Sequence, residues 1–507
     1  MTSTDKTSSR AGPREWLGLA TLALPTLLVA IDMTVLHLAV PSITTALEPS
    51  STQMLWIVDI YGFMIAGLLI SMGTIGDRIG RRRLLMIGTA AFGVASMLAA
   101  FAASPEMLIL ARALLGITAA TLMPSTLSLI TNMFADDGQR GLAIALWSSV
   151  FMAGTAAGPL LGGVLLEHFW WGSVFLLNVP LTLVVLIAAP LLLPEHRSEK
   201  LGRIDLPSVA LLLAGMLGGV YGIKQIAAHG ADLQAWAFVL AGAALIFIFA
   251  RRQLRLSNPM IDLTLFRIPA FSSALGIQFL AIFSVGAPYF LGSQYLQLVL
   301  GLSPLDAGLA MLPATVAGIV GAIAASKLAI VMRPALVIAL MLGVGAAGLA
   351  LLAGTGNPPG LPLLVTGLTL ATIGSSATMT LTVNLIVSAA PPERAGEASG
   401  LSETSGEFGM ALGIAVLGSL SVAVYRSQVA GDLPADLPPN LANAAQDSLG
   451  MLAAALNETA HPVATQLSSL GNAAFANGMA AVALAGSGLM VVLAGISMAF
   501  LRRARSD

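Results

Sequence analysis

Four carboxylates stand in apolar stretches where a charged side chain is unfavourable. Asp32 lies inside the run Leu17 to Val40 and Asp59 inside the next apolar run, while Glu403 and Glu407 share a later one. A charge at the centre of a bilayer costs about 2.5–3.5 kcal/mol on insertion scales. Residues of this kind usually mark ion or substrate pathways, so the four carboxylates are the candidate functional residues.

Glu403 and Glu407 are four residues apart and therefore share one face of a helix. At 1.5 Å per residue, Glu407 lies about 15 Å into its span, close to the membrane midplane. The two charges repel each other, which favours a bound proton on at least one of them. This arrangement is suited to proton exchange, although a polar helix start in a water-filled vestibule remains an alternative for Glu403.

Each of the other carboxylates also has a plainer interpretation. Asp32 is either functional or the structural partner of a buried basic group, and Asp59 is either functional or a wetted outer carboxylate. Arg112 stands in an apolar run and needs a partner of its own. Asp306 follows Ser303 and Pro304, and an acidic residue there suits the first turn of a helix, so we favour a capping role.

The composition places these residues in a membrane protein. Of the 507 residues 57% are hydrophobic and only 10% charged, and the mean hydropathy is +0.88, whereas soluble domains carry about 25% charged residues. Runs of about 20 apolar residues predict membrane-spanning helices. We expect an all-α membrane protein with fourteen spans, near 17–39, 53–74, 84–103, 107–131, 140–165, 173–193, 206–226, 233–250, 271–297, 305–326, 334–354, 362–388, 397–424 and 476–500.

The positions of the basic residues predict an orientation. If both termini are cytoplasmic, nearly all of the 24 Lys and Arg residues fall in cytoplasmic segments, as the positive-inside rule requires. There are three exceptions: Arg112 is expected within the fourth span, and Lys224 and Arg426 at or beyond the outer surface.

The spans group as six, two and six. The expected divisions are a cytoplasmic tail (1–16), an N-terminal six-helix bundle (17–193), two additional helices with flanking cytoplasmic loops (194–270), a C-terminal six-helix bundle (271–500) with a long outer loop (426–471), and a cytoplasmic tail (501–507). Within the outer loop, residues 444–458 are compatible with a helix. The loop is either a solvated linker or a small ordered hairpin over the outer mouth.

Two sequence patterns add to this plan. The loop after the second span carries Gly73, Asp77, Arg78, Gly80 and Arg81, which permit a tight turn anchored by basic residues at the anionic leaflet. The fifth span carries small residues at helix-packing spacing and a bend-forming proline, namely Gly154, Gly158, Pro159, Gly162 and Gly163. Taken singly, the first is a topology anchor and the second a packing face.

Taken together with Arg112 and the fourteen spans, these patterns resemble the major facilitator superfamily. The chain is similar to its fourteen-helix drug–proton antiporter branch over essentially its whole length. The resemblance implies two six-helix bundles with two extra central helices. It also implies that the loop after the second span latches one conformational state and that the glycine–proline pattern is the antiporter motif.

The resemblance further implies a function. Proteins of this branch export lipophilic organic cations such as quaternary ammonium antiseptics, biguanides and intercalating dyes in exchange for protons. Their acidic residues for proton coupling and cation binding map onto Asp32, Asp59, Glu403 and Glu407. We expect a multi-pass protein of the bacterial cytoplasmic membrane, most simply a monomer among membrane lipids, driven by the proton gradient with no cofactor, metal or nucleic acid. Aromatic candidates for stacking on a flat cation, or for simple packing, are Trp56, Tyr61, Trp147, Phe151 and Tyr289.

Other classes of protein fit less well. The chain has no cysteine and no Gly-x-x-x-x-Gly-Lys-Ser/Thr phosphate loop, which argues against thiol catalysis and against an ATP-driven pump. No nucleophile–base cluster suggests an enzyme. The nearest alternative is an exporter of an endogenous metabolite or lipid. An anionic substrate needs buried basic residues, and the sequence offers only Arg112.

Overall fold

The computed structural model describes residues 11–195, 205–256, 259–355, 360–391, 394–434, 437–458 and 463–501. Parts of the expected cytoplasmic segments, 1–10, 196–204 and 502–507, lie outside the described residues. The first half contains α1 (Pro13–Leu47), α2 (Ser51–Ile79), α3 (Arg81–Ala100), α4 (Pro105–Met133), α5 (Asp137–His168), α6 (Ser173–Leu176) and α7 (Asn178–Leu192). The two additional helices are α8 (Leu206–His229) and α9 (Leu233–Gln253).

The second half begins with the short turn η1 (Leu265–Arg267) and with α10 (Pro269–Gln294), which continues as the π-helical turn η2 (Tyr295–Val299). Its remaining helices are α11 (Pro304–Val331), α12 (Pro334–Leu352), α13 (Leu361–Ala389), α14 (Ala395–Asp432), α15 (Pro439–Asp447), α16 (Leu449–Glu458) and α17 (Ala464–Phe500). Within the described residues, fourteen helical segments are long and apolar enough to cross a membrane, with α6 and α7 counted as one. The predicted all-α fold with fourteen spans is confirmed.

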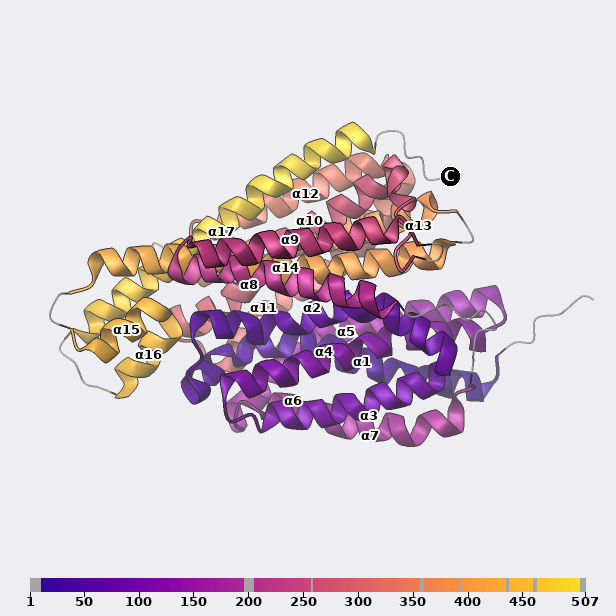
Figure 1. Ribbon diagram of the computed structural model, residues 1–507, viewed down its shortest axis with the longest axis horizontal. Coiled ribbons are helices and arrows are strands. Elements are labelled where there is room, and N and C mark those ends of the chain that lie inside the picture. The colour runs from indigo at the N-terminus through magenta and orange to yellow at the C-terminus, as the bar shows by residue number, and fades with distance from the viewer. Residues whose placement is uncertain are drawn as a thin grey trace, which may run out of the picture.

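The two halves lie side by side along the long axis of the molecule (Figure 1). In that view the helices of the first half fill the lower layer, α10, α12, α13 and α17 lie in the upper one, and α8 and α9 run across the front. The short helices α15 and α16 project at one end, called here the hairpin end. The opposite end, where α2 turns into α3, is called the loop end.

Small residues let helices of the two halves come close together. A Cβ on Gly62 of α2 would lie 3.0 Å from the Cβ of Ala411 on α14. A Cβ on Gly163 of α5 would lie 2.8 Å from the backbone of Leu305 on α11. Because apolar side chains gain little by leaving lipid for protein, close packing of small residues is a main source of helix association in membranes.

The helix starts follow from the sequence. Ser50 begins α2 with a capping box, since its side chain accepts from the backbone N–H of Gln53 while the Gln53 side chain accepts from the backbone N–H of Ser50. Asp205 and Asp232 cap α8 and α9 by accepting from backbone N–H groups three residues on. These contacts satisfy donors that the first helical turn leaves without partners.

The predicted outer loop is largely helical. Helix α14 continues past Arg426 to Asp432, and α17 already begins at Ala464. The helix-compatible stretch from 444 to 458 is divided between α15 and α16, because Ser448 between them has extended backbone angles. Of the two interpretations left open by the sequence, the ordered hairpin is the one that the structure contains.

Candidate functional site

Asp32 lies in a buried polar network inside the first half. The Nη1 atom of Arg112 donates a hydrogen bond to Asp32 Oδ2 at 2.5 Å, and Asn178 Nδ2 approaches Asp32 Oδ1 at 3.4 Å. Arg112 also donates from Nε to the carbonyl of Ile57 at 3.2 Å, and Asn178 donates to Ser96. Asp32 and Arg112 are each only 1% exposed. The structural interpretation of Asp32, as partner of a buried basic group, therefore holds in this conformation.

Tyr61 of α2 packs against this network. Its ring lies under the Arg112 guanidinium, 4.4 Å from ring centroid to Cζ. Gly116 of α4 makes this approach possible, because a Cβ there would lie 2.5 Å from the Tyr61 carbonyl oxygen. The buried hydroxyl of Tyr61 has no hydrogen-bond partner among the described residues.

Asp59 is bound by a lysine from one of the two additional helices. Lys224 Nζ lies 3.0 Å from Asp59 Oδ1 and 2.9 Å from Oδ2, and each residue is 1% exposed. Lys224 is buried in the protein and not exposed, and the alternative of a wetted Asp59 is wrong. Lys224 stands five residues before the end of α8, where hydropathy alone suggests an interfacial position, but its side chain turns inward onto α2.

Glu403 and Glu407 differ from the other two acids. Both are half-buried on α14, and no hydrogen bond or ion pair involves either side chain within the part of the chain that the structure describes. Nearby, Gln278 fixes α10 to α14 by donating to the Ser402 carbonyl at 2.8 Å. Phe408 lies beside Phe63 of α2, with ring centroids 6.2 Å apart, so α14 meets the first half at the level of these glutamates.

Asp306 occupies the position expected of a helix-start residue. It is exposed in the first turn of α11, and its backbone N–H donates to Ser303 Oγ at 3.1 Å. Ser303 is the capping residue itself, and its hydroxyl donates to the Asp306 carboxylate at 3.0 Å. The geometry gives Asp306 a local role at this helix end.

The aromatic candidates contact groups of the protein itself. Trp56 lies under Lys224, with 3.7 Å between the ring centroid and Nζ. Tyr289 packs edge-on against His37, with ring centroids 5.9 Å apart. Trp147 and Phe151 are half-buried against the main apolar core. Of the five, Trp56 and Tyr61 already stack on a buried cation.

The loop between α2 and α3 contains an ion pair within the motif itself. Arg81 donates to Asp77 Oδ1 at 2.6 Å, while Arg78 is exposed. Gly80 has φ of +109°, a value that favours glycine, and the Glu195 carboxylate occupies the place where a Cβ would stand. Glu195 also accepts from the backbone N–H of Arg82 at 3.2 Å, which links this loop to the segment after α7.

The small residues of α5 allow close packing on two sides of this helix. A Cβ on Gly158 would lie 2.0 Å from Thr34 Oγ1, and Gly154 and Gly162 meet α1 in the same way. Gly73, which belongs to α2 and the loop motif, is less crowded, because a Cβ there would have only the side chain of Pro124 within 4 Å. On the other side of α5, Gly308 of α11 would place a Cβ 2.5 Å from the Pro159 carbonyl oxygen. The motif thus joins α1 to α11 across the two halves.

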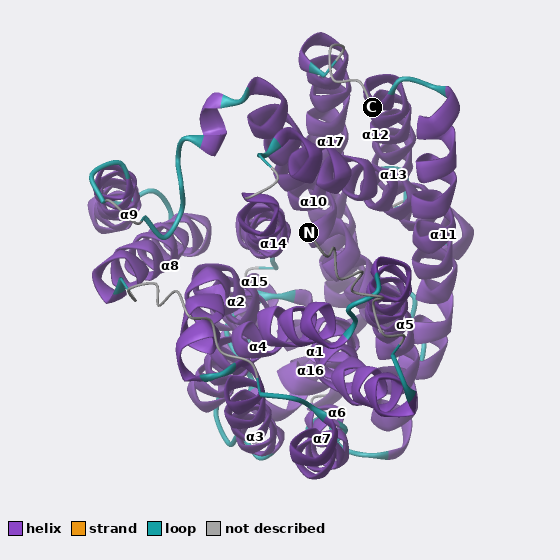
Figure 2. Ribbon diagram, turned by 90° about the vertical axis from the view of Figure 1, so that its right-hand side faces the viewer, coloured by secondary structure: helices purple, strands orange, loops and turns teal. Residues whose placement is uncertain are grey.

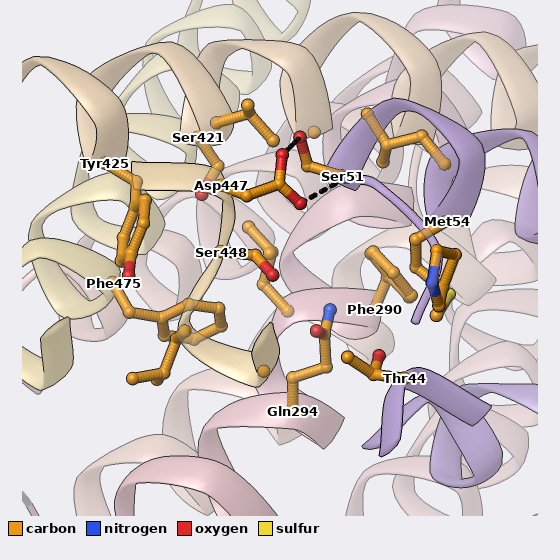
Figure 3. Close-up of a pocket in the computed structure, with 17 residues that line it drawn as sticks. Thr44, Ser51, Met54, Phe290, Gln294, Ser421, Tyr425, Asp447, Ser448 and Phe475 are labelled. Atoms are coloured by element: carbon orange, nitrogen blue, oxygen red, sulfur yellow. Dashed lines mark hydrogen bonds between the residues drawn. The ribbon is translucent and has the colours of Figure 1, made fainter. Parts of the chain in front are cut away.

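A pocket lies beneath the hairpin and is lined by both halves (Figure 3). Asp447 accepts from the backbone N–H and the hydroxyl of Ser51, at 3.0 and 3.3 Å. Arg426 of α14 donates to Asp447 at 2.6 Å and also to the carbonyl of Ala228. One carboxylate therefore connects the hairpin with the start of α2 and with α14, and the hairpin covers this end of the junction between the halves.

The profile of the Major Facilitator Superfamily matches residues 22–414. The chain belongs to this superfamily. Multidrug efflux pump LfrA of Mycolicibacterium smegmatis is 43% identical to this facilitator over 496 residues, which are 98% of each chain. Methyl viologen resistance protein SmvA of Salmonella typhimurium is 37% identical over 450 residues, covering 86% of this chain and 88% of its own.

Solved structures agree with the fold of this facilitator. A bacterial homologue of the human lysosomal transporter Spinster, in an inward-facing and unoccupied conformation, superposes with a TM-score of 0.68. The superposition covers 97% of this chain and 98% of that one at 19% identity. The predicted family and the predicted fold are confirmed, and the facilitator is a multi-pass membrane protein whose relatives are named as a multidrug efflux pump and a methyl viologen resistance protein.

Sequence reasoning about this facilitator missed four polar partners: Lys224, Asn178, Glu195 and Asp447. Asn178 gives the clearest signal in retrospect, because an amide in an apolar run needs a partner. Lys224 gives a weaker one, since a lysine near a helix end usually extends to the interface. Glu195 and Asp447 lie in connecting segments, where nothing in the sequence distinguishes a pairing residue from a solvated one.

Proposed function

We propose that the chain is a proton-coupled exporter of lipophilic organic cations that works by alternating access of its two six-helix halves. Its substrates are quaternary ammonium antiseptics, biguanides and intercalating dyes. It lies in the bacterial cytoplasmic membrane with both termini in the cytoplasm. Two relatives support the proposal: a multidrug efflux pump that matches 98% of the chain, and a resistance protein against methyl viologen, an organic cation, that matches 86% of it.

The observation that carries the proposal is the unsatisfied charge of Glu403 and Glu407. Asp32 and Asp59 are neutralised by Arg112 and Lys224, whereas the two glutamates have no basic partner within the described residues. Two carboxylates one helical turn apart, half-buried at the junction of the halves, attract either protons or an organic cation. Binding of one excludes the other, which is the requirement for exchange.

The energetics favour exchange of more than one proton for each cation. About 100 mV of membrane potential contributes about 2.3 kcal/mol for each net charge that moves inward. One pH unit adds about 1.4 kcal/mol for each proton. Two glutamates permit two protons to enter as one monovalent cation leaves, so the membrane potential then assists export.

The alternative function is export of an endogenous metabolite or lipid. An anionic substrate needs a free buried cation, but Arg112 lies on Asp32 and Lys224 on Asp59. Contrary to the expectation from sequence, the described residues contain three buried basic side chains, Arg81, Arg112 and Lys224, and each is already paired with a carboxylate. A cationic or neutral substrate is therefore favoured.

The test is movement of ethidium by the purified full-length protein in liposomes under an imposed proton gradient. We expect uptake against the ethidium gradient that stops when a protonophore is added. The variant Glu403→Gln/Glu407→Gln should remove it, while Asp306→Asn, at an exposed helix start, should behave as wild type. Ethidium movement that ignores the protonophore would refute proton coupling. Absence of any movement would refute cation export.

A further inference from the structure

The Asp59–Lys224 pair has the chemistry of an occupied cation site. The ammonium lies between both carboxylate oxygens of Asp59, at 2.9 and 3.0 Å, and it lies 3.7 Å from the centroid of the Trp56 ring. A carboxylate together with an aromatic face is an arrangement that binds organic cations. Trp56 is half-buried, whereas Asp59 and Lys224 are each 1% exposed. The protein's own lysine therefore fills a site of the kind that a ligand cation needs.

The lysine comes from a helix outside both six-helix halves. Helix α8 lies along the line where α2 meets α14, and Leu213 fills the space beside Gly67 of α2. Met216 packs in one apolar cluster with Phe63 of α2 and Ala411 of α14. Figure 2 shows α9 beyond α8, at the edge of the molecule. The additional helix is thus placed to bring Lys224 onto the junction of the halves.

We propose that Lys224 is a tethered occupant of a cation site formed by Asp59 and Trp56, and that it determines whether a ligand with two positive charges can use that site. The inference rests on the proposed export of organic cations. With Lys224 in place the Asp59 site has no net charge, and Glu403 and Glu407 alone attract a ligand. A monovalent cation needs only the glutamates. A divalent cation gains the carboxylate of Asp59, in addition to the two glutamates, only when Lys224 withdraws along its flexible side chain.

A purely structural pair gives a different expectation. Removing one member of a buried ion pair leaves an uncompensated charge and destabilises the fold, and replacing both members restores stability. In that case neutralising Lys224 gains no ligand binding. Binding affinity for cations of different charge therefore separates the two roles, with fold checked independently by size-exclusion chromatography.

The experiment is calorimetric titration of the full-length protein in lipid nanodiscs with ethidium, a monovalent cation, and methyl viologen, a divalent one. We expect Lys224→Met to bind methyl viologen about tenfold more tightly, a gain of about 1.4 kcal/mol, with ethidium changed by less than about twofold. Lys224→Arg keeps the charge and should match wild type. Lys224→Met/Asp59→Asn should lose the gain.

Arg252→Met is the matched control, because Arg252 also pairs with a carboxylate, that of Asp205 at the cap of α8, at 2.9 Å, but is partly exposed. It should leave both affinities unchanged. Lys224→Gln, whose amide can still donate to Asp59, is a second neutral variant with the same expected gain. If both neutral variants fail to fold, the pair is a folding element and the proposal is overturned.

The chain has no cysteine, which permits chemical rescue. In Lys224→Cys, aminoethyl methanethiosulfonate restores a tethered ammonium and should restore the weaker binding of methyl viologen, whereas the neutral methyl reagent should not. Wild type that binds ethidium, together with a folded Lys224→Met that gains no affinity for methyl viologen, would overturn this inference alone. Wild type that binds neither cation would overturn the proposed function as well.

Discussion

Asp32 and Arg112 form a fully buried ion pair, with Oδ2 of one 2.5 Å from Nη1 of the other. They lie 80 residues apart in the chain, on α1 and α4. The pair binds two helices of the same half together, and the Tyr61 ring of α2 lies against the Arg112 guanidinium. Changes at Asp32 therefore affect stability as well as any proton chemistry, and the two effects need separate measurement.

Replacing Asp32 alone should destabilise the protein. Asp32→Asn leaves Arg112 buried without a counter-charge, which typically costs about 3–5 kcal/mol. We expect a lower midpoint of thermal unfolding in detergent and loss of ethidium export. Asp32→Asn/Arg112→Gln should recover most of the unfolding midpoint. If the double variant also recovers export, Asp32 has no part in coupling.

Glu407→Gln should act on transport and not on stability. The side chain has no hydrogen-bond or ion-pair partner among the described residues, so its amide removes a charge without leaving another charge unpaired. We expect proton-driven ethidium uptake to fall by at least about tenfold, equal to about 1.4 kcal/mol, with the unfolding midpoint unchanged. Export at the wild-type rate by this variant would remove Glu407 from the mechanism.

The hairpin end should open during transport. A Cβ on Gly450 of α16 would lie 3.5 Å from the Cβ of Thr44 on α1, at the lower limit of the range for a disulfide. Thr44→Cys/Gly450→Cys introduces the only two thiols in the chain. We expect oxidation to block ethidium export and reduction to restore it. Full export by the oxidised protein, with the bond verified by mass spectrometry, would show that this contact stays closed.

The glycine face of α5 should not tolerate a methyl group at Gly158. A Cβ there would lie 2.0 Å from Thr34 Oγ1 and 3.2 Å from the backbone oxygen of Ile31, so α1 must move. Overpacking of this kind typically costs about 1–3 kcal/mol. We expect Gly158→Ala to lower the unfolding midpoint. Gly141→Ala on the same helix meets no atom within 4 Å and should be neutral or stabilising. Equal stability of the two variants would contradict the packing role.

The sequence by itself determined the number of spans, the fold and the position of the acidic residues along their helices. Span length and hydropathy are local properties, because a bilayer requires each crossing segment to be long and apolar on its own. The loop motif and the glycine–proline motif are likewise contiguous. Asp306 and Ser303 could be assigned to a helix start for the same reason, since capping involves neighbours within one turn.

The tertiary structure alone decided which acids are neutralised. Asp59 and Lys224 are 165 residues apart, and their contact depends on how α8 is rotated against α2. Hydropathy carries no information about that rotation, so it placed Lys224 at the surface. The same packing leaves Glu403 and Glu407 without a partner among the described residues. The four carboxylates look alike in the sequence, but two of them form ion pairs and the other two form a site without a basic partner among the described residues. Helix packing decides this, because it sets which side chains meet.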